Sequence, residues 1–241
     1  MLPTREPPAS RPSWAGIPAE DRRAGRRARL LDAAFDLLGT EGWAATTVRA
    51  VCQRARLNPR YFYESFDDLD ALLVAVYDRT VEQLAASVLQ VLDATGADPR
   101  VQTRAGIDAI VRFVDEDRRR GRVLYVEGIG NEALNRRRIQ TGHALVELVE
   151  RDAAGRYGAP PSGEPIGRIG AAILVGGFSE LLQAWLAGRI AVPRDQLVDD
   201  ATGLFLALGE SAGKIAATRA GGGPTTGRRA AARRPTRRTG P

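Results

Sequence analysis

Apolar residues recur at spacings of three and four through most of this 241-residue chain, and this period constrains the fold more than any other feature. In residues 21–43, leucines, alanines and a phenylalanine follow the spacing while arginines occupy the opposite face. This is the period of an amphipathic helix. Few segments alternate as strands do, and none carries a hairpin turn signal. The sequence therefore predicts an all-α protein of about nine helices.

Glycine, proline and asparagine divide the helical pattern into regions. Residues 1–22 are rich in proline and lack apolar periodicity, so we expect a disordered arm. Residues 23–70 contain one longer helix followed by two short ones, and residues 71–218 contain the remaining helices. A long helix joins these two regions. Residues 219–241 are rich in Gly, Pro and Arg and are expected to form a disordered basic tail.

Composition narrows the classes of protein that this chain can be. The formal net charge of +6 comes mostly from seven arginines in the tail, so the body is nearly neutral and its charge alone does not indicate a nucleic-acid partner. Cys52 is the single cysteine, which excludes an internal disulfide and suits a reducing compartment. The N-terminus lacks a signal-peptide pattern, and the uncharged run 169–179 is shorter than the roughly 20 residues of a membrane span. We expect a cytoplasmic protein without a membrane partner.

The stretch "NPRYFYESF" (58–66) follows a short helix and a tight turn. Two short helices joined in this way, after a longer helix, are the components of a helix-turn-helix DNA reader. Asn58 is expected to cap the second short helix, and Pro59 to occupy its first position. Phe62 and Phe66 lie four residues apart and are expected to be core. The opposite face of this helix is therefore left to other side chains.

The side chains on that opposite face have the chemistry of DNA recognition. Arg60 supplies donors that bind guanine bidentately, and Tyr61 suits a thymine methyl or a phosphate. Tyr63 lies off the core stripe, where its hydroxyl suits a backbone phosphate. Thr47 caps the preceding helix, whose first turn carries Arg49 and free N–H groups that favour a phosphate. The candidate DNA-contacting set is Thr46, Thr47, Arg49, Asn58, Pro59, Arg60, Tyr61 and Tyr63.

The segment "GTEGWAATTVRAVCQRARLNPRYFYESFDDLDALL" resembles the DNA-binding domain of the TetR family of bacterial transcriptional regulators. The likeness covers roughly residues 24–76. It rests on a glycine-bearing turn, a "TT-V-R" start to the second helix, and an aromatic helix ending "Y-x-x-F". The resemblance implies a dimer, with Thr47 and Tyr63 at phosphates. It also implies that Arg49, Asn58, Arg60 and Tyr61 approach the bases.

Two positions depart from the family pattern. Arg56 stands at the turn position that usually holds glycine, which puts the turn geometry in question. Leu69 replaces a lysine common at the start of the fourth helix, which removes one phosphate contact. The alternative is a three-helix packing unit in which Tyr61 and Tyr63 are half-buried and Arg60 is a solvated charge.

The resemblance implies that residues from about 77 to 217 form a helical ligand-sensing and dimerisation domain. Pocket candidates, chosen by residue type, are Phe113, Tyr125, His143, Phe178 and Trp185. Small and apolar residues on the last two helices predict a dimer interface of Gly170, Leu174, Gly177, Leu181, Leu204 and Leu208. Ordinary core packing is the alternative for both sets. With one histidine and one cysteine, we expect no metal, and no cofactor is implied.

Two other functions compete with this interpretation. Residues 123–133, "VLYVEGIGNEA", mimic a strand followed by the dinucleotide fingerprint at Gly128 to Ala133, but that fingerprint requires a βαβ unit. A helix break explains the glycines better. The basic tail also suits a protein that coats DNA regardless of sequence. We expect no enzyme, but a homodimeric repressor that binds a near-palindromic double-stranded operator, associates with the nucleoid when DNA-bound, and is released by an unknown small-molecule effector.

Overall fold

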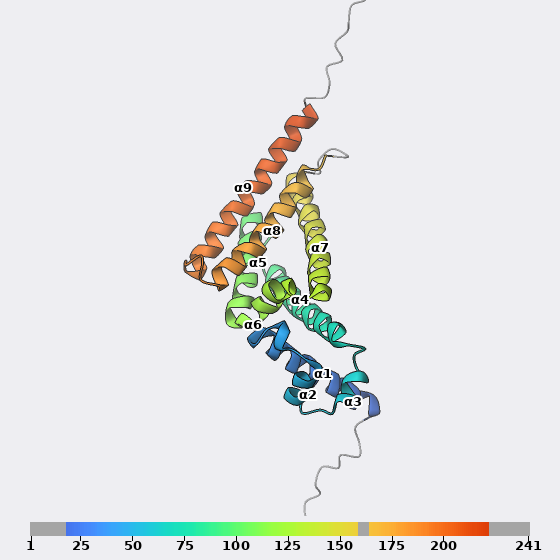
Figure 1. Ribbon diagram of the computed structural model, residues 1–241. Coiled ribbons are helices and arrows are strands. Elements are labelled where there is room, and N and C mark those ends of the chain that lie inside the picture. Colours follow the sequence, from blue (N-terminus) through green and yellow to red (C-terminus); the bar gives the residue numbers. More distant parts are fainter. Residues whose placement is uncertain (1–17, 159–163, 222–241) are drawn as a thin grey trace, which may run out of the picture.

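The computed structural model describes residues 18–158 and 164–221, and all regular structure in those ranges is helical. This confirms the all-α class. The helices divide into a small group at one end of an elongated molecule and a larger group at the other (Figure 1). They are α1 (Ala19–Thr40), α2 (Val48–Ala55), α3 (Pro59–Tyr63), α4 (Leu69–Asp93), α5 (Pro99–Glu116), α6 (Arg118–Gly121), α7 (Glu132–Tyr157), α8 (Ile166–Leu186) and α9 (Arg194–Gly221).

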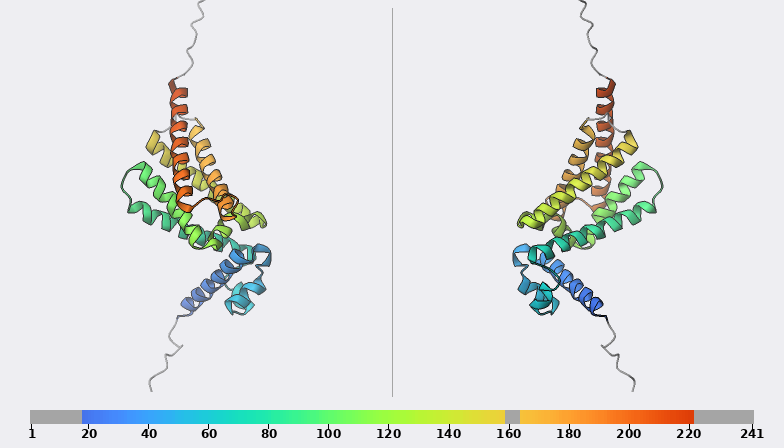
Figure 2. Two further views of the ribbon diagram at one scale, coloured as in Figure 1. Left: turned by 90° about the vertical axis from the view of Figure 1, so that its left-hand side faces the viewer. Right: turned by 90° about the vertical axis from the view of Figure 1, so that its right-hand side faces the viewer.

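Five long helices form a ring in the larger group. Around the ring α4 contacts α5, α5 contacts α9, α9 contacts α8, α8 contacts α7, and α7 returns to α4. Figure 1 shows α9 along one edge of this group, and both views of Figure 2 show α1 to α3 extending from the end of the molecule opposite the C-terminal end of α9. Because α4 packs on α1 as well as on α5 and α7, it belongs to both groups.

Apolar periodicity builds the core of the small group. Leu30, Leu38 and Phe62 are fully buried and belong to one continuous cluster with Val76 of α4 and Val111 of α5. Removing such side chains from water is the main favourable term in folding. The cluster therefore joins the small group to the ring through apolar contact.

Polar side chains cap the first turn of successive helices. Thr47 accepts a hydrogen bond from the Ala50 N–H at 3.1 Å, and Asn58 accepts from the Arg60 N–H at 2.9 Å. Asp68 caps α4 and Asn131 caps α7 in the same way. Each cap satisfies a backbone N–H that has no partner within its helix, so it fixes where the helix starts.

Some boundaries differ from the sequence prediction. α1 begins at Ala19, so the last four residues assigned to the N-terminal arm are helical. The helical segment that starts at Pro99 breaks at Asp117, which has an extended backbone and caps α6. α9 continues to Gly221, beyond the expected start of the tail. The rest of the arm and tail lies outside the described residues.

The glycine-rich stretch after α6 is helical rather than a strand. A π-helical turn, η3 (Arg122–Val126), is followed by a 3-10 turn, η4 (Glu127–Ile129). No strand occurs in the described ranges, so the βαβ context of a dinucleotide site is absent there. Gly130 lies directly against the indole of Trp43, where a Cβ would collide. The glycine at that position allows α7 to start close to the turn after α1.

Arginines on α6 and η3 bind the end of α1 to the ring. Arg119 donates to Asp36 of α1 at 3.0 Å and to Asp117 at 2.8 Å, and its guanidinium lies 5.2 Å from the ring centroid of Phe35. The hydrogen bond from Arg119 to Asp117 holds the pKa of this carboxyl below its usual range. Arg122 donates to the Thr40 carbonyl at 2.7 Å, across the same boundary. The last turn of α1 is thus anchored by two side chains from the other group.

The carboxylate of Glu127 completes this junction from a buried position. It accepts a hydrogen bond from the Trp43 N–H at 2.9 Å and pairs with Arg122 at 2.5 Å. Its side chain is only 7% exposed. A buried charge that lost its partners would cost several kilocalories per mole, so the turn after α1, η3 and η4 are held in one relative position.

α8 is apolar enough to need separate mention. It has 21 residues and a window of mean hydropathy 1.5, so by length and composition it could cross a membrane. The expectation that no segment is long enough to cross a membrane therefore fails on length and composition. α8 packs against α7 and α9 and contributes Leu182 to the core, and 28% of that window is buried.

The turn between α2 and α3 contains an arginine in a conformation that favours glycine. Arg56 has φ 52° and ψ 48°, the left-handed region, and its N–H bonds to carbonyls at the end of α2. The turn therefore has the geometry that glycine would provide, in spite of the substitution. The cost is steric, because Cβ approaches the following carbonyl oxygen.

We predict that Arg56→Gly stabilises the protein. Relief of the left-handed strain, offset by the greater unfolded-state freedom of glycine, should raise the free energy of unfolding by about 0.5–1 kcal/mol. Urea denaturation followed by circular dichroism measures this change. Arg56→Ala is the control, since it removes the side chain but keeps the strain and should stay within about 0.5 kcal/mol of wild type. Equal stability of the Gly and Ala variants would contradict the explanation.

Candidate DNA-binding surface

The helix α3 lies at the outer end of the small group, next to α2 (Figure 1). It has only five residues, too few to be stable alone. Phe62 is fully buried, Phe66 is 6% exposed, and their ring centroids lie 6.0 Å apart, which confirms the prediction that both are core. Burial of these rings fixes which face of α3 is turned to solvent.

The solvent face of α3 carries the predicted base- and phosphate-contacting side chains. The side chain of Arg60 is 83% exposed, Tyr61 is 37% exposed and Tyr63 is 61% exposed. Asn58 and Pro59, the cap and first residue of the helix, are also exposed. The alternative of half-buried tyrosines therefore does not describe Tyr63, whose ring meets that of Phe62 edge-on at 5.2 Å and extends outward.

At the start of α2, two of the three residues predicted to contact DNA are exposed. Thr47 caps the helix and is exposed, and Arg49 in the first turn is exposed. The prediction for Thr46 is contradicted. It is 1% exposed, and its hydroxyl donates to the Gly42 carbonyl at 2.8 Å, so this side chain closes the turn after α1 and is not free to contact DNA.

Arginines of α1 contact the end of α2 and the residues that follow α3, a role that we did not predict. Arg23 donates to the Glu64 carbonyl at 2.7 Å. Arg27 lies with its guanidinium 4.8 Å from the ring centroid of Phe66. Arg29 donates to the Ala55 carbonyl at 2.5 Å. The sequence signal for these contacts is the repeated arginine on the polar face of α1.

Glu64, at the end of α3, connects Arg60 with α1. Its Oε1 accepts a hydrogen bond from Arg60 Nε at 3.1 Å, and its Oε2 lies 3.4 Å from an Arg26 nitrogen. The guanidinium of Arg26 also stacks 4.6 Å from the ring centroid of Tyr61. A single carboxylate therefore touches the two arginines on either side of it.

The five predicted pocket residues do not surround one cavity. Phe113 is buried beneath the guanidinium of Arg120, and the ring of Phe178 packs edge-on against Phe205 at 5.4 Å. Trp185 donates to the Val192 carbonyl at 3.0 Å. In these three, the core-packing alternative describes what is observed.

The other two pocket candidates differ from each other. Tyr125 is partly buried against the core, and this burial raises the pKa of its hydroxyl. His143 is exposed on α7 and does not face the ring interior as a pocket residue must. Among the described residues no cluster of His, Cys, Asp or Glu could hold a metal ion.

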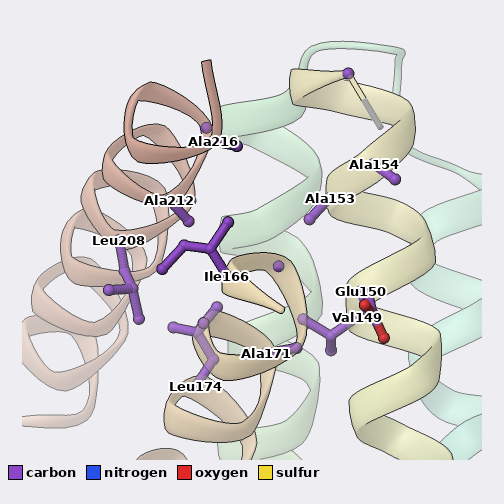
Figure 3. A pocket seen from close by; sticks show the side chains of 15 residues that line it. Val149, Glu150, Ala153, Ala154, Ile166, Ala171, Leu174, Leu208, Ala212 and Ala216 are labelled. Carbon is purple, nitrogen blue, oxygen red and sulfur yellow. The ribbon is translucent and has the colours of Figure 1, made fainter. Parts of the chain in front are cut away.

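A cavity lies elsewhere, between α7, α8 and α9 (Figure 3). It is lined mainly by alanines and glycines, with the carboxylate of Glu150 at its side. Its volume is about 50 Å³, whereas pockets for small-molecule ligands span roughly 300–1,000 Å³. This space does not hold an effector of ordinary size without rearrangement.

The predicted dimer residues separate into two groups. Gly170, Leu174 and Leu208 line the cavity within the subunit, and Leu181 packs on the core, so these four residues make contacts inside the subunit, and their place in a dimer interface stays a prediction. Sequence spacing alone did not distinguish the two faces of each helix.

Gly177 of α8 and Leu204 of α9 are exposed, the leucine by 68%. Ile169, Ile173 and Ile215 on the same two helices are also exposed. This apolar set, hereafter the α8–α9 face, has no partner among the described residues.

Comparisons with known proteins agree with this architecture. Residues 30–76 match the sequence model of bacterial regulatory proteins of the tetR family. The transcriptional activator FasR of Mycolicibacterium smegmatis is 26% identical over 136 residues, covering 54% of this chain and 62% of that protein. The regulator BetI of Burkholderia ambifaria is 33% identical over 93 residues, covering 39% and 48%. The chain thus spans between about half and three fifths of these relatives, which are named as regulators, not enzymes.

Solved structures extend the likeness of fold beyond the DNA-binding end. A TetR-like regulator from a Rhodococcus species aligns with TM-score 0.58 and 23% identity, covering 80% of this chain and 96% of that one. The fatty acid degradation regulator FadR from Bacillus halodurans aligns with TM-score 0.63 and 13% identity, covering 75% and 94%. Residues 30–76 thus carry a helix-turn-helix of the tetR family of bacterial regulatory proteins, and the helical ring that follows has the fold of the solved TetR-like regulators.

Proposed function

We propose that the protein is a transcriptional repressor that binds a near-palindromic operator as a homodimer and is released by a small-molecule effector. It acts in the cytoplasm, on the nucleoid. The observation that carries the proposal is the solvent face of α3, where Arg60, Tyr61 and Tyr63 are exposed while Phe62 fixes the orientation of the helix. Side chains of this type read base edges and hold phosphates when a short helix enters the major groove.

The α8–α9 face supports the homodimer. Exposed apolar residues on two neighbouring helices mark an interaction surface, and two such helices from each subunit make a four-helix interface. Leu204 and Ile173, with exposed fractions of 68% and 56%, lose the most contact with water when the face is covered. A two-fold axis there places one α3 from each subunit on the DNA, as a palindromic operator requires.

Release by an effector is supported by the junction between the two groups of helices. Arg119, Arg122 and Glu127 connect the end of α1 to the ring. A change in the ring therefore reaches α1 to α3, hereafter the reading head, through these residues. A ligand shifts such an equilibrium only by its differential affinity for the two states. Among proteins of this fold, one is named a fatty acid degradation regulator and another a multidrug binding protein, EbrR, complexed with imidazole.

The experiment that tests the proposal is selection of bound DNA from random sequences by the purified protein at roughly physiological salt, where non-specific binding is weak. We expect enrichment of an inverted repeat, and the same enrichment by a chain truncated after residue 218. Absence of any enriched sequence, with binding that disappears as salt rises, would contradict the proposal. Loss of all binding on truncation would favour a protein that coats DNA through its tail.

Arg60→Ala should lower affinity for the selected operator by about 1–3 kcal/mol and relax the preference at one base pair. Tyr63→Phe should weaken binding to all sequences alike, because its hydroxyl is expected at a phosphate. Fluorescence anisotropy with single-base operator variants measures both effects. A uniform loss in Arg60→Ala would reduce this arginine to a phosphate contact.

Leu204→Glu should convert the dimer to a monomer, because it places a charge in the centre of the α8–α9 face. Sedimentation velocity measures the change, and operator affinity should fall with it. Leu148→Glu on α7, which replaces a leucine that is also exposed, by 55%, is the matched control and should remain dimeric. Dissociation of the control instead of Leu204→Glu would move the interface to α7.

A further inference from the structure

We propose that Glu64 is a specificity-determining residue that acts through Arg60. This inference rests on the proposed function, in which Arg60 reads a base pair. Glu64 does not itself contact the base. It holds the guanidinium of Arg60 in the orientation needed for reading.

The guanidinium of Arg60 uses one of its donors for Glu64. Its Nε donates to Glu64 Oε1 at 3.1 Å. The contact leaves the edge formed by the two terminal nitrogens unused by the carboxylate. Guanine offers O6 and N7 as two acceptors in the major groove, and arginine binds them with paired donors. Use of Nε by Glu64 therefore leaves free an edge of two terminal nitrogens, which can donate to both guanine acceptors.

The carboxylate is itself held in place. Its second oxygen faces Arg26 at 3.4 Å, and Arg26 stacks on the ring of Tyr61 at 4.6 Å. The backbone carbonyl of Glu64 accepts from Arg23 at 2.7 Å. The Glu64 side chain is 34% exposed, against 83% for Arg60. Glu64 is therefore fixed by α1 on one side and orients a solvent-exposed arginine on the other.

A merely stabilising ion pair does not explain the arrangement as well. Exposed pairs contribute little to stability because water screens them and side-chain entropy opposes them. A negative charge beside a DNA-facing arginine also opposes binding to every phosphate nearby. Its compensating effect is preorganisation, because an arginine already aligned loses less rotational freedom when it meets the base.

Loss of Glu64 should therefore lower specificity and raise affinity for non-operator DNA, and these opposite changes can be tested. The variant Glu64→Ala is compared with wild type on the selected operator and on operators altered at the base pair that Arg60→Ala relaxes. An intact arginine–guanine contact discriminates by roughly five- to 150-fold. In Glu64→Ala we expect discrimination at this base pair to fall about two- to fivefold, the range of exposed ion pairs. Affinity for non-operator DNA should rise, since a repulsive charge has gone.

Three further variants separate positioning from a structural effect. Glu64→Gln keeps an oxygen acceptor, so its discrimination at this base pair should be intermediate between that of wild type and that of Glu64→Ala. In an Arg60→Ala background, Glu64→Ala should not change discrimination at that base pair. Glu116→Ala in α5 is the matched control. Like Glu64, Glu116 lies four residues after an arginine, Arg112, and pairs with two arginines, Arg112 at 3.9 Å and Arg120 at 3.7 Å. It should leave discrimination unchanged.

Several results would overturn the inference. They are unchanged discrimination in Glu64→Ala, an equal fall at every operator position, a fall that persists without Arg60, and a glutamine variant no better than alanine. Failure of the proposed function looks different. No operator is then enriched, or Arg60→Ala itself relaxes no base pair while wild-type binding stays sequence-specific. In either case the role of Glu64 falls with that of Arg60.

Discussion

Burial of Phe62 is the interaction on which the reading head depends. A helix of five residues has too few internal hydrogen bonds to persist in water, so α3 exists because its neighbours bury that ring completely. The same burial sets the rotation of α3 and turns Arg60 and Tyr63 outward. Contacts from α1, made by Arg23 to Glu64 and by Arg27 to Phe66, then hold the chain just after the C-terminal end of the helix. Recognition chemistry on a short helix is possible because a larger helix holds it.

The junction between the reading head and the ring combines apolar and ionic contact. The core cluster runs without interruption from α1 into α4 and α5, which makes the two groups of helices one packed unit. Arg119 and Glu127 add directional contacts at the end of α1, and Gly130 permits the close approach of Trp43. Charged and hydrogen-bonded contacts have a preferred geometry, whereas apolar packing is less directional. The junction is therefore suited to transmit a defined change of position.

Much of the fold and of the candidate site followed from sequence. Helical periodicity predicted the class, and the caps Thr47 and Asn58 predicted where α2 and α3 start, because these signals act over a few residues. The burial of Thr46, next to a correctly predicted cap, was missed because its partner is the Gly42 carbonyl, a feature of turn geometry. The predictions of ligand-pocket residues and dimer-interface residues were the weakest. Their residue types were plausible, but their positions depend on how α7, α8 and α9 pack.

The sequence by itself determined the all-α class, the start of each reading helix and the chemistry that α3 offers to solvent, since helix period, capping and side-chain type are local properties. Only the tertiary structure decided which faces of α8 and α9 are shared within the subunit and which remain open. It alone revealed that Arg56 adopts the left-handed turn, and that Glu64 lies between Arg26 and Arg60. Such pairings join residues distant in sequence, and their geometry is fixed by packing of whole helices, which no local pattern specifies.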